Sequence, residues 1–210
     1  MKQSPRRIKS IVFDLGRVVL DFDHRIAAEK ISCFTDKPGE EIYNLFFDSR
    51  LTRLFEEGKI TPREFFLEIK KTLKLKLSYR SFLPIWNEIF YLSEKNIAVH
   101  KLANALKVKY RLAILSNINI LHLNFIKRNF SVLEAFHHVF PSCAMGAIKP
   151  DPKIFRKALE ALSACPQDVF YTDDRPELIA GAKKLGIRAF VFKSAKQLKK
   201  DLLTCGVSVN

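Results

Sequence analysis

Five short runs of consecutive apolar residues constrain the fold more than any other feature of the sequence. Strands that are covered on both faces have such runs, whereas a strand with one solvent-exposed face alternates apolar and polar residues. Helical patterns separate the later runs, and strand–helix–strand alternation favours right-handed crossovers in a parallel sheet. We therefore predict an α/β fold, a doubly wound, Rossmann-like parallel sheet, with strands at 10–14, 111–116, 137–142, 168–172 and 188–192. Its predicted helices lie at about 93–107, 119–129, 151–162 and 175–185.

The alternation is interrupted between residue 24 and about residue 90, where helical patterns occur without a convincing strand. Thr61-Pro62 indicates one helix start, because a proline at the first helical position loses no hydrogen bond. We predict an all-helical cap of about four helices, inserted after the first strand. The predicted domains are an α/β core, 1–22 and 92–210, and a cap, 23–91. The aromatic residues expected to pack inside the cap are Phe46, Phe47, Phe65, Phe66 and Trp86.

The formal net charge of +14 raises the question of a polyanionic partner. However, the lysines of 70–76 and 193–200 are mixed with apolar residues at helical spacing, and no nucleic-acid-binding motif accompanies them. We therefore expect no nucleic acid partner. The cysteines are too widely spaced for a zinc site, and no apolar run is long enough to span a bilayer. We expect a cytoplasmic protein without a membrane partner, and the sequence predicts no particular oligomeric state.

Polar side chains stand at the carboxyl ends of four predicted strands, which meet at one edge of an open parallel sheet. These residues are Asp14, Ser116, Asn117, Lys149, Asp173 and Asp174. A carboxylate can act as a nucleophile towards phosphorus, and hard oxygen ligands suit Mg²⁺. A lysine offsets the repulsion between a carboxylate and a phosphate. The set therefore predicts phosphoryl transfer.

Four segments resemble, in order, the four motifs of the haloacid-dehalogenase-like (HAD) hydrolases, and the resemblance covers nearly the whole chain. The segments are IVFDLGRVVL, LSNIN, GAIKPDPKIF and FYTDDRPELIAGAKKLG. The helical insertion matches the cap of the first type in this family. The resemblance is to a subgroup that includes sugar-phosphate phosphatases, among them an enzyme acting on glucose 1-phosphate. It implies a Mg²⁺-dependent phosphomonoester hydrolase that acts on a small phosphorylated metabolite through an aspartyl-phosphate intermediate.

The resemblance also implies a role for each motif residue. Asp14 is the nucleophile and a magnesium ligand; the carbonyl of Gly16 and the carboxylate of Asp174 are further ligands. Asp173 lies beside them and contacts the magnesium ion through a water molecule. The residues that bind or neutralise the phosphoryl group are Ser116, Asn117 and Lys149.

The sequence departs from the family pattern at three positions. Gly16 stands where most family phosphatases have a second aspartate, and such general acid–base catalysis contributes roughly 10²–10⁴-fold. Leu178 replaces the usual asparagine of the fourth motif, which leaves Glu177 as the nearest polar residue. Arg17 occupies a variable position. It either binds a second anionic group of the substrate or faces solvent.

The substrate-facing part of the cap is expected within residues 48–61, and its candidate residues are Arg53, Glu56 and Glu57. The histidines lack ligand spacing, and we assign them no role. Three alternatives stay open. The chain is a phosphate-binding or regulatory protein with little turnover, a 2-haloacid dehalogenase on the same scaffold, or a nucleic-acid binder. The pair Asp173-Asp174 argues against the dehalogenase, because a dehalogenase needs no metal.

Overall fold

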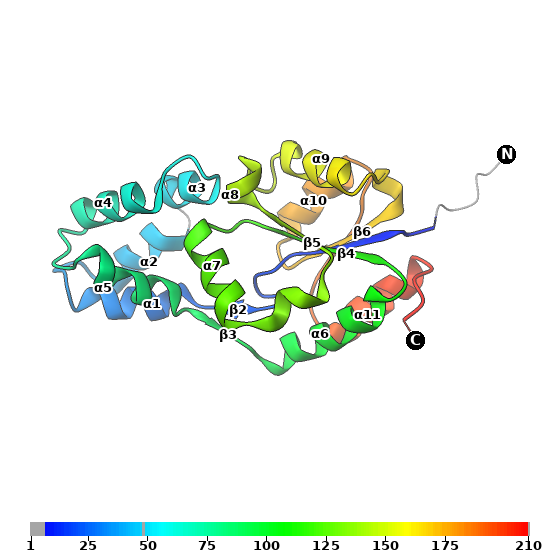
Figure 1. Cartoon of the computed structure of the whole chain (residues 1–210), viewed down its shortest axis with the longest axis horizontal. Coiled ribbons are helices and arrows are strands. Elements are labelled where there is room, and N and C mark those ends of the chain that lie inside the picture. The colour runs from blue at the N-terminus through cyan, green and yellow to red at the C-terminus, as the bar shows by residue number, and fades with distance from the viewer. Residues whose placement is uncertain (1–6, 48, 210) are drawn as a thin grey trace.

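The computed structural model describes residues 7–47 and 49–209, which form a parallel five-stranded sheet and a helical cap (Figure 1). Every neighbouring pair of strands in this sheet is parallel. The strand order across it is β5 (His138–Pro141), β4 (Arg111–Ser116), β1 (Ser10–Phe13), β6 (Val169–Asp173) and β7 (Arg188–Val191). The predicted fold class is confirmed.

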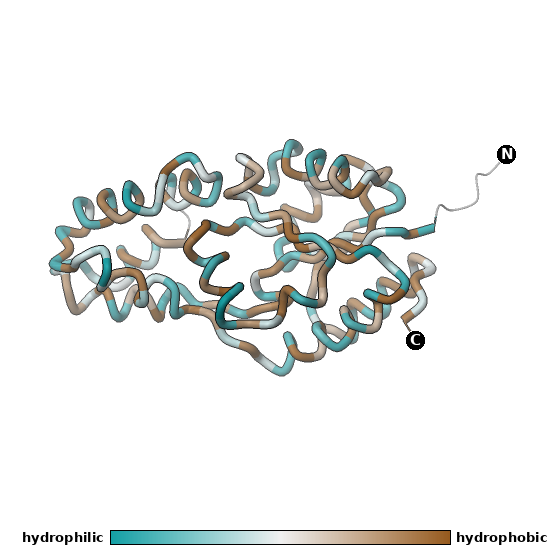
Figure 2. Tube along the Cα trace, in the orientation of Figure 1, coloured by the Kyte–Doolittle hydropathy of each residue, from teal (hydrophilic) through white to brown (hydrophobic). Residues whose placement is uncertain are grey.

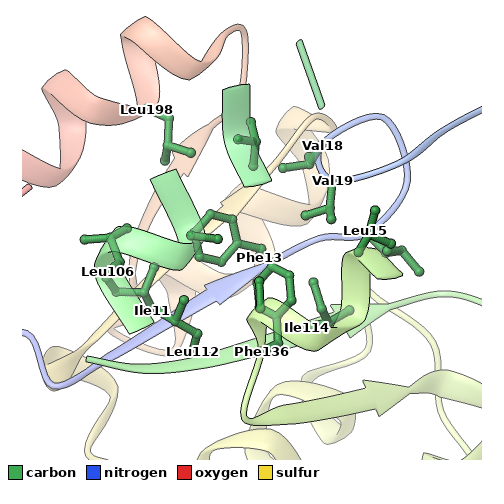
Figure 3. Packing of buried hydrophobic residues seen from close by; sticks show 14 of the residues in the cluster. Ile11, Phe13, Leu15, Val18, Val19, Leu106, Leu112, Ile114, Phe136 and Leu198 are labelled. Atoms are coloured by element: carbon green, nitrogen blue, oxygen red, sulfur yellow. The ribbon is translucent and has the colours of Figure 1, made fainter. Parts of the chain in front are cut away.

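Helices cover both faces of the sheet, which explains the continuous apolar runs of its strands. The side chains of Ile11 and Phe13 share one buried cluster with helices from one face, whereas Val12 belongs to a second cluster on the opposite face. Figure 3 shows the first cluster around Phe13. Its helices are α6 (Glu94–Lys107), α7 (Ile120–Asn129) and α11 (Ala195–Thr204). Those on the second face are α9 (Pro152–Ala161) and α10 (Pro176–Lys184).

The cap lies at one end of the molecule, away from the chain termini (Figure 1). Hydrophilic and hydrophobic residues alternate along its helices, as expected when one side of each helix packs inward (Figure 2). Its helices are α1 (His24–Ser32), α2 (Gly39–Phe47), α3 (Arg50–Glu56), α4 (Pro62–Thr72) and α5 (Tyr79–Asn87). Phe46, Phe65, Phe66 and Trp86 are buried in its core, as predicted.

The cap differs from the prediction in two details. It contains five helices among the described residues, because 50–56 form α3. It is also joined to the core by a short antiparallel ribbon of β2 (Asp21–Phe22) and β3 (Phe90–Tyr91), which includes residue 90, where no strand was predicted. Two-residue strands are too short to give a periodic signal, and pairing across the chain defines them. Within the described ranges, none of the helices combines the length and apolar character needed to cross a membrane.

His122 connects the core to the cap through its ring. The imidazole of His122, on α7, stacks on Trp86 of α5 with 4.7 Å between ring centroids. Its Nε2 lies 2.9 Å from the carbonyl oxygen of Trp86, and its Nδ1 lies 3.0 Å from the side-chain nitrogen of Asn119. A neutral ring that donates from Nε2 and accepts at Nδ1 satisfies both contacts. Burial, together with the nearby His24, lowers the pKa of His122 to about 3.

We expect this histidine to make the protein sensitive to acid. Since an unfolded histidine binds a proton near pH 6.5 and the folded one does not, lowering the pH from 7 to 5 favours the unfolded state by ~2 kcal/mol. Urea unfolding at both pH values should show that His122→Gln loses about 2 kcal/mol less than wild type over this interval. The exposed His137→Gln is the control. Equal pH sensitivity of wild type and His122→Gln would contradict the expectation.

Candidate active site

The predicted site residues of four segments come together at the carboxyl edge of the sheet. Asp14 directly follows β1, and its backbone N–H donates to the carbonyl of Thr172 on β6 at 2.8 Å. Ser116 ends the neighbouring strand β4, and Asp173 ends β6. The register of the parallel pairs therefore brings these ends to the same level, although about 160 residues separate β1 and β6 in the chain.

Lys149 forms the charged centre of the site. Its Nζ lies 2.7 Å from Oδ1 of Asp14 and 2.6 Å from Oδ2 of Asp173, and it donates to the carbonyl of Leu115 at 2.9 Å. Burial alone would lower the pKa of Lys149, but the two carboxylates outweigh burial and raise it above its ordinary value. Lys149 is therefore a buried, charged ammonium group shared by two acids.

Asn117 holds Lys149 in place. Its side-chain oxygen accepts a hydrogen bond from the backbone N–H of Lys149 at 2.7 Å, and its side-chain nitrogen donates to the carbonyl of Lys149 at 3.0 Å. Both backbone groups of the lysine are thus fixed by one amide side chain. The structure gives Asn117 this positioning contact, whereas the sequence suggested only a phosphate ligand.

Three carboxylates form a cluster that suits a divalent cation. Asp14, Asp173 and Asp174 each offer an oxygen, and these oxygens lie within 4.8 Å of one another. Burial and the neighbouring acids raise the pKa of Asp14 to about 7 despite Lys149, and burial and Asp173 raise the pKa of Asp174. The negative charge of the cluster is therefore only partly offset by Lys149. Carboxylate oxygens and an excess of negative charge are what Mg²⁺ requires of its site.

Asp173 differs from the other two acids because protein donors occupy both of its oxygens. One oxygen accepts from Lys149 and from the hydroxyl of Tyr171, and the other accepts from the backbone N–H of Arg175 at 3.0 Å. This arrangement suits the supporting position that the sequence predicts for Asp173. Asp14 and Asp174 are then the side chains best placed to ligate a cation directly.

A cavity of about 230 Å³ lies between this cluster and the cap. The core contributes Asp14, Ser116, Lys149 and Asp174 to its wall, and the cap contributes His24, Phe47, Arg53 and Glu56. Arg53 and Glu56 thus lie where the sequence placed candidate substrate contacts, whereas Glu57 is absent from this wall and pairs with Lys59 at 2.5 Å. The cavity is of a size for a small metabolite rather than for a polymer.

Helix α3 contributes Arg53 and Glu56 to this cap wall, and its end contacts the core. The hydroxyl of Ser142, on α8 (Ser142–Met145), donates to the carbonyl of Glu56 at 2.6 Å. Gly58 follows α3 with φ of 70°, and a Cβ there would lie 2.2 Å from the carbonyl oxygen of Cys143. Only glycine permits this approach of the two backbones without a shift. Gly58 therefore allows the cap to close against the core beside the cavity.

Two cavity residues were not found from the sequence. Phe47 was predicted to lie inside the cap, but it is 38% exposed and lines the cavity. His24 was assigned no role, yet it also lines the cavity, and its Nδ1 has no hydrogen-bond partner within residues 7–47 and 49–209. The helical pattern shows which side of a helix is apolar. It does not show which residues at the border of that side face another domain.

The structure explains two departures from the family pattern. A Cβ at Gly16 would lie 2.6 Å from Cε1 of Phe22, so the ring of Phe22 takes the space that a larger residue would need. Leu178 is buried and lines the cavity, which makes this part of the wall apolar. Glu177 does not replace the missing asparagine, because its carboxylate pairs with Arg175 at 2.6 Å on the surface.

A larger hollow of about 550 Å³ lies at the opposite, amino-terminal edge of the sheet. Its wall includes Lys9, Lys109 and Arg111, and none of its described lining residues is a carboxylate. It therefore lacks both a carboxylate nucleophile and carboxylate ligands for a metal. The smaller cavity, by contrast, is lined by residues of all four motifs.

Comparison with known proteins agrees with the geometry. The family model described as haloacid dehalogenase-like hydrolase matches residues 8–186. D-ribitol-5-phosphate phosphatase of Bacteroides thetaiotaomicron is 22% identical, over 93% of this chain and 97% of that protein. Glyceraldehyde 3-phosphate phosphatase of Pyrococcus furiosus is 28% identical, over 94% and 85%. A solved HAD family enzyme from Bacteroides thetaiotaomicron, in complex with magnesium and inorganic phosphate, has a TM-score of 0.77 at 26% identity and covers 89% of this chain and 95% of that one. The predicted family resemblance is confirmed.

Proposed function

Since the chain belongs to the haloacid dehalogenase-like hydrolases and is a phosphatase, we propose that it hydrolyses a small sugar phosphate with Mg²⁺ as its cofactor. The observation that carries this proposal is the convergence of Asp14, Lys149 and Asp174 on one cavity. Phosphatases of this family use a divalent metal, and a similar enzyme has been solved with magnesium and phosphate. A second buried carboxylate, Asp173, supports the same site.

In the proposed reaction, a carboxylate oxygen of Asp14 attacks phosphorus in line with the leaving oxygen. A bond forms between Asp14 and phosphorus while the bond to the leaving alcohol breaks, which gives an aspartyl-phosphate. Water then attacks phosphorus, the bond between Asp14 and phosphorus breaks, and inorganic phosphate leaves with the protons of the water while Asp14 returns to its carboxylate form. Lys149 keeps the nucleophile oriented and offsets the charge of the incoming phosphate, and Ser116 donates its hydroxyl to a phosphoryl oxygen.

Asp14, the carbonyl of Gly16 and Asp174 would hold Mg²⁺, which when bound would stabilise the negative charge on the phosphoryl oxygens. Because Gly16 carries no acid, the leaving alcohol takes its proton from water. Good leaving groups should therefore be hydrolysed faster than poor ones. The cap excludes bulk water and contacts the leaving group.

The names of the relatives support the substrate class. The two similar phosphatases act, by their names, on ribitol 5-phosphate and glyceraldehyde 3-phosphate, which are short molecules with a terminal phosphate. The cavity of about 230 Å³ suits molecules of this size. We propose a substrate of similar length.

Phosphate release from a panel of sugar phosphates and from p-nitrophenyl phosphate tests the proposal. We expect release that depends on Mg²⁺ and stops when EDTA removes it. If the purified protein binds phosphate esters but releases no phosphate with any divalent metal, it is a binding or regulatory protein instead. Chloride release from 2-haloacids without metal would identify a dehalogenase.

A further inference from the structure

Arg17 is exposed to solvent, and it combines an unusual backbone with a position on the wall of the catalytic cavity. It lies three residues after Asp14, and its φ is 59°, a left-handed conformation that costs a residue with a side chain roughly 1–2 kcal/mol. Its backbone N–H donates to the carbonyl of Leu20 at 2.8 Å, which closes a tight turn after β1. Backbone strain of this kind is concentrated at functional sites. The turn therefore places an arginine where the chain after the nucleophile meets the cap.

Two aromatic rings hold the side chain of Arg17. The guanidinium carbon lies 5.4 Å from the ring centroid of Phe22 and 5.9 Å from that of Phe47. Phe22 belongs to the ribbon that connects core and cap, and Phe47 ends helix α2. Cation–π contacts with both rings orient the guanidinium without neutralising its charge.

The charge of Arg17 is not balanced by an ion pair. No carboxylate within residues 7–47 and 49–209 forms a salt bridge with Arg17. By contrast, Arg175, another arginine on the wall, pairs with Glu177, and the nearby Asp21 is engaged by Lys95 at 2.8 Å. Lys149 is already shared by two acids. Burial raises the pKa of Asp174 and the nearby Arg17 opposes that rise, so the guanidinium lies close to the acidic cluster without pairing with it. Arg17 therefore offers positive charge to a group that enters the cavity.

We propose that Arg17 binds a carboxylate on the leaving group, so that the preferred substrate is a phosphorylated sugar acid rather than a neutral sugar phosphate. This inference rests on the proposed function. A guanidinium presents two parallel N–H donors that match a carboxylate, and such charge-assisted pairs are stronger than neutral hydrogen bonds. The phosphate of the substrate lies at Asp14 and Lys149. The second anionic group then lies beside Phe22 and Phe47, the two rings that hold the guanidinium.

A pair of substrates that differ in one group tests the inference. D-Glyceraldehyde 3-phosphate and 3-phosphoglycerate have the same carbon chain, but the first ends in an aldehyde and the second in a carboxylate. With Mg²⁺ present, we expect wild type to have the higher kcat/KM for 3-phosphoglycerate. In Arg17→Asn the ratio of the two kcat/KM values should fall about 10–100-fold, mainly through KM, because a hydrogen bond between charged groups contributes about 1.5–3 kcal/mol.

The choice of variants separates the charge from the backbone. Asparagine tolerates a positive φ and carries no charge, so the turn should be kept. Arg17→Lys keeps the charge but not the paired donors, and it should retain part of the preference. Arg156→Asn, at an exposed position of α9 outside the cavity, is the control and should keep the wild-type ratio.

Two results would overturn the inference, and they differ from each other. If wild type and Arg17→Asn both release phosphate but share the same substrate ratio, Arg17 does not bind the carboxylate, and the phosphatase proposal stands. If neither substrate nor p-nitrophenyl phosphate gives Mg²⁺-dependent phosphate release, the proposed function and the inference both fail.

Discussion

Asp14→Asn should reduce Mg²⁺-dependent hydrolysis of p-nitrophenyl phosphate by about 10⁴-fold or more, because replacing a nucleophile removes the whole covalent route. Asparagine has the shape of aspartate, but its amide oxygen carries no charge and is a poor nucleophile. The buried ammonium of Lys149, 2.7 Å from Asp14, keeps its second partner Asp173. The variant should therefore fold, and its circular dichroism spectrum should match that of wild type.

Asp168→Asn is the matched control for this experiment. Asp168 is also buried and also pairs with a lysine, because its carboxylate lies 3.0 Å from Nζ of Lys9. It lies just before β6, at the opposite edge of the sheet from Asp14. Its replacement should leave most of the activity. Acid-quenched wild type should carry phosphate on the peptide that contains Asp14. Activity of Asp14→Asn close to that of Asp168→Asn would contradict the nucleophilic role.

The core of the fold was predictable because its strands are covered on both sides. Helices α6 and α11 cover one face and α9 and α10 cover the other, so the strand 111–116 contains only apolar residues between Arg111 and Ser116. Helix α3 was not predictable in the same way. It has seven residues, of which only Thr52 and Phe55 are buried, and this is too few to give a helical period.

The candidate site was predictable to the extent that topology determines it. Asp14, Ser116 and Asp173 follow or end separate strands, and parallel strands bring their carboxyl ends together. Lys149 comes after β5 and α8, so a loop rather than a strand end positions it. The contacts that refine the site depend on side-chain packing across the chain. Asn117 binds the backbone of Lys149, and the ring of Phe22 packs beside Gly16. No periodic pattern in the sequence relates the two residues of either pair.

Lys149→Met should destabilise the protein by about 3–5 kcal/mol, because it leaves buried carboxylates without their cation. Methionine has a similar length and no charge, so packing changes little. Asp14 and Asp173 would then repel each other within the cluster, and one of them would stay protonated at neutral pH. Burial already raises the pKa of Asp14 to about 7 with Lys149 present, so Asp14 would be the protonated acid. A protonated Asp14 cannot attack phosphorus, and activity should fall about 10³-fold. Urea unfolding and phosphate release measure the two effects.

The repulsion can be tested apart from the loss of the lysine itself. Mg²⁺ should raise the free energy of unfolding of Lys149→Met more than that of wild type, because the cation takes over part of the lost positive charge. Asp173→Asn, added to Lys149→Met, removes one of the two uncompensated charges and should restore part of the stability, although Asp173→Asn alone destabilises the protein. Lys153→Met, at an exposed position of α9, controls for the methionine. If the losses in free energy of unfolding caused by Lys149→Met and by Asp173→Asn simply add in the double variant, the buried acids do not depend on Lys149. The ammonium then does not hold the site together.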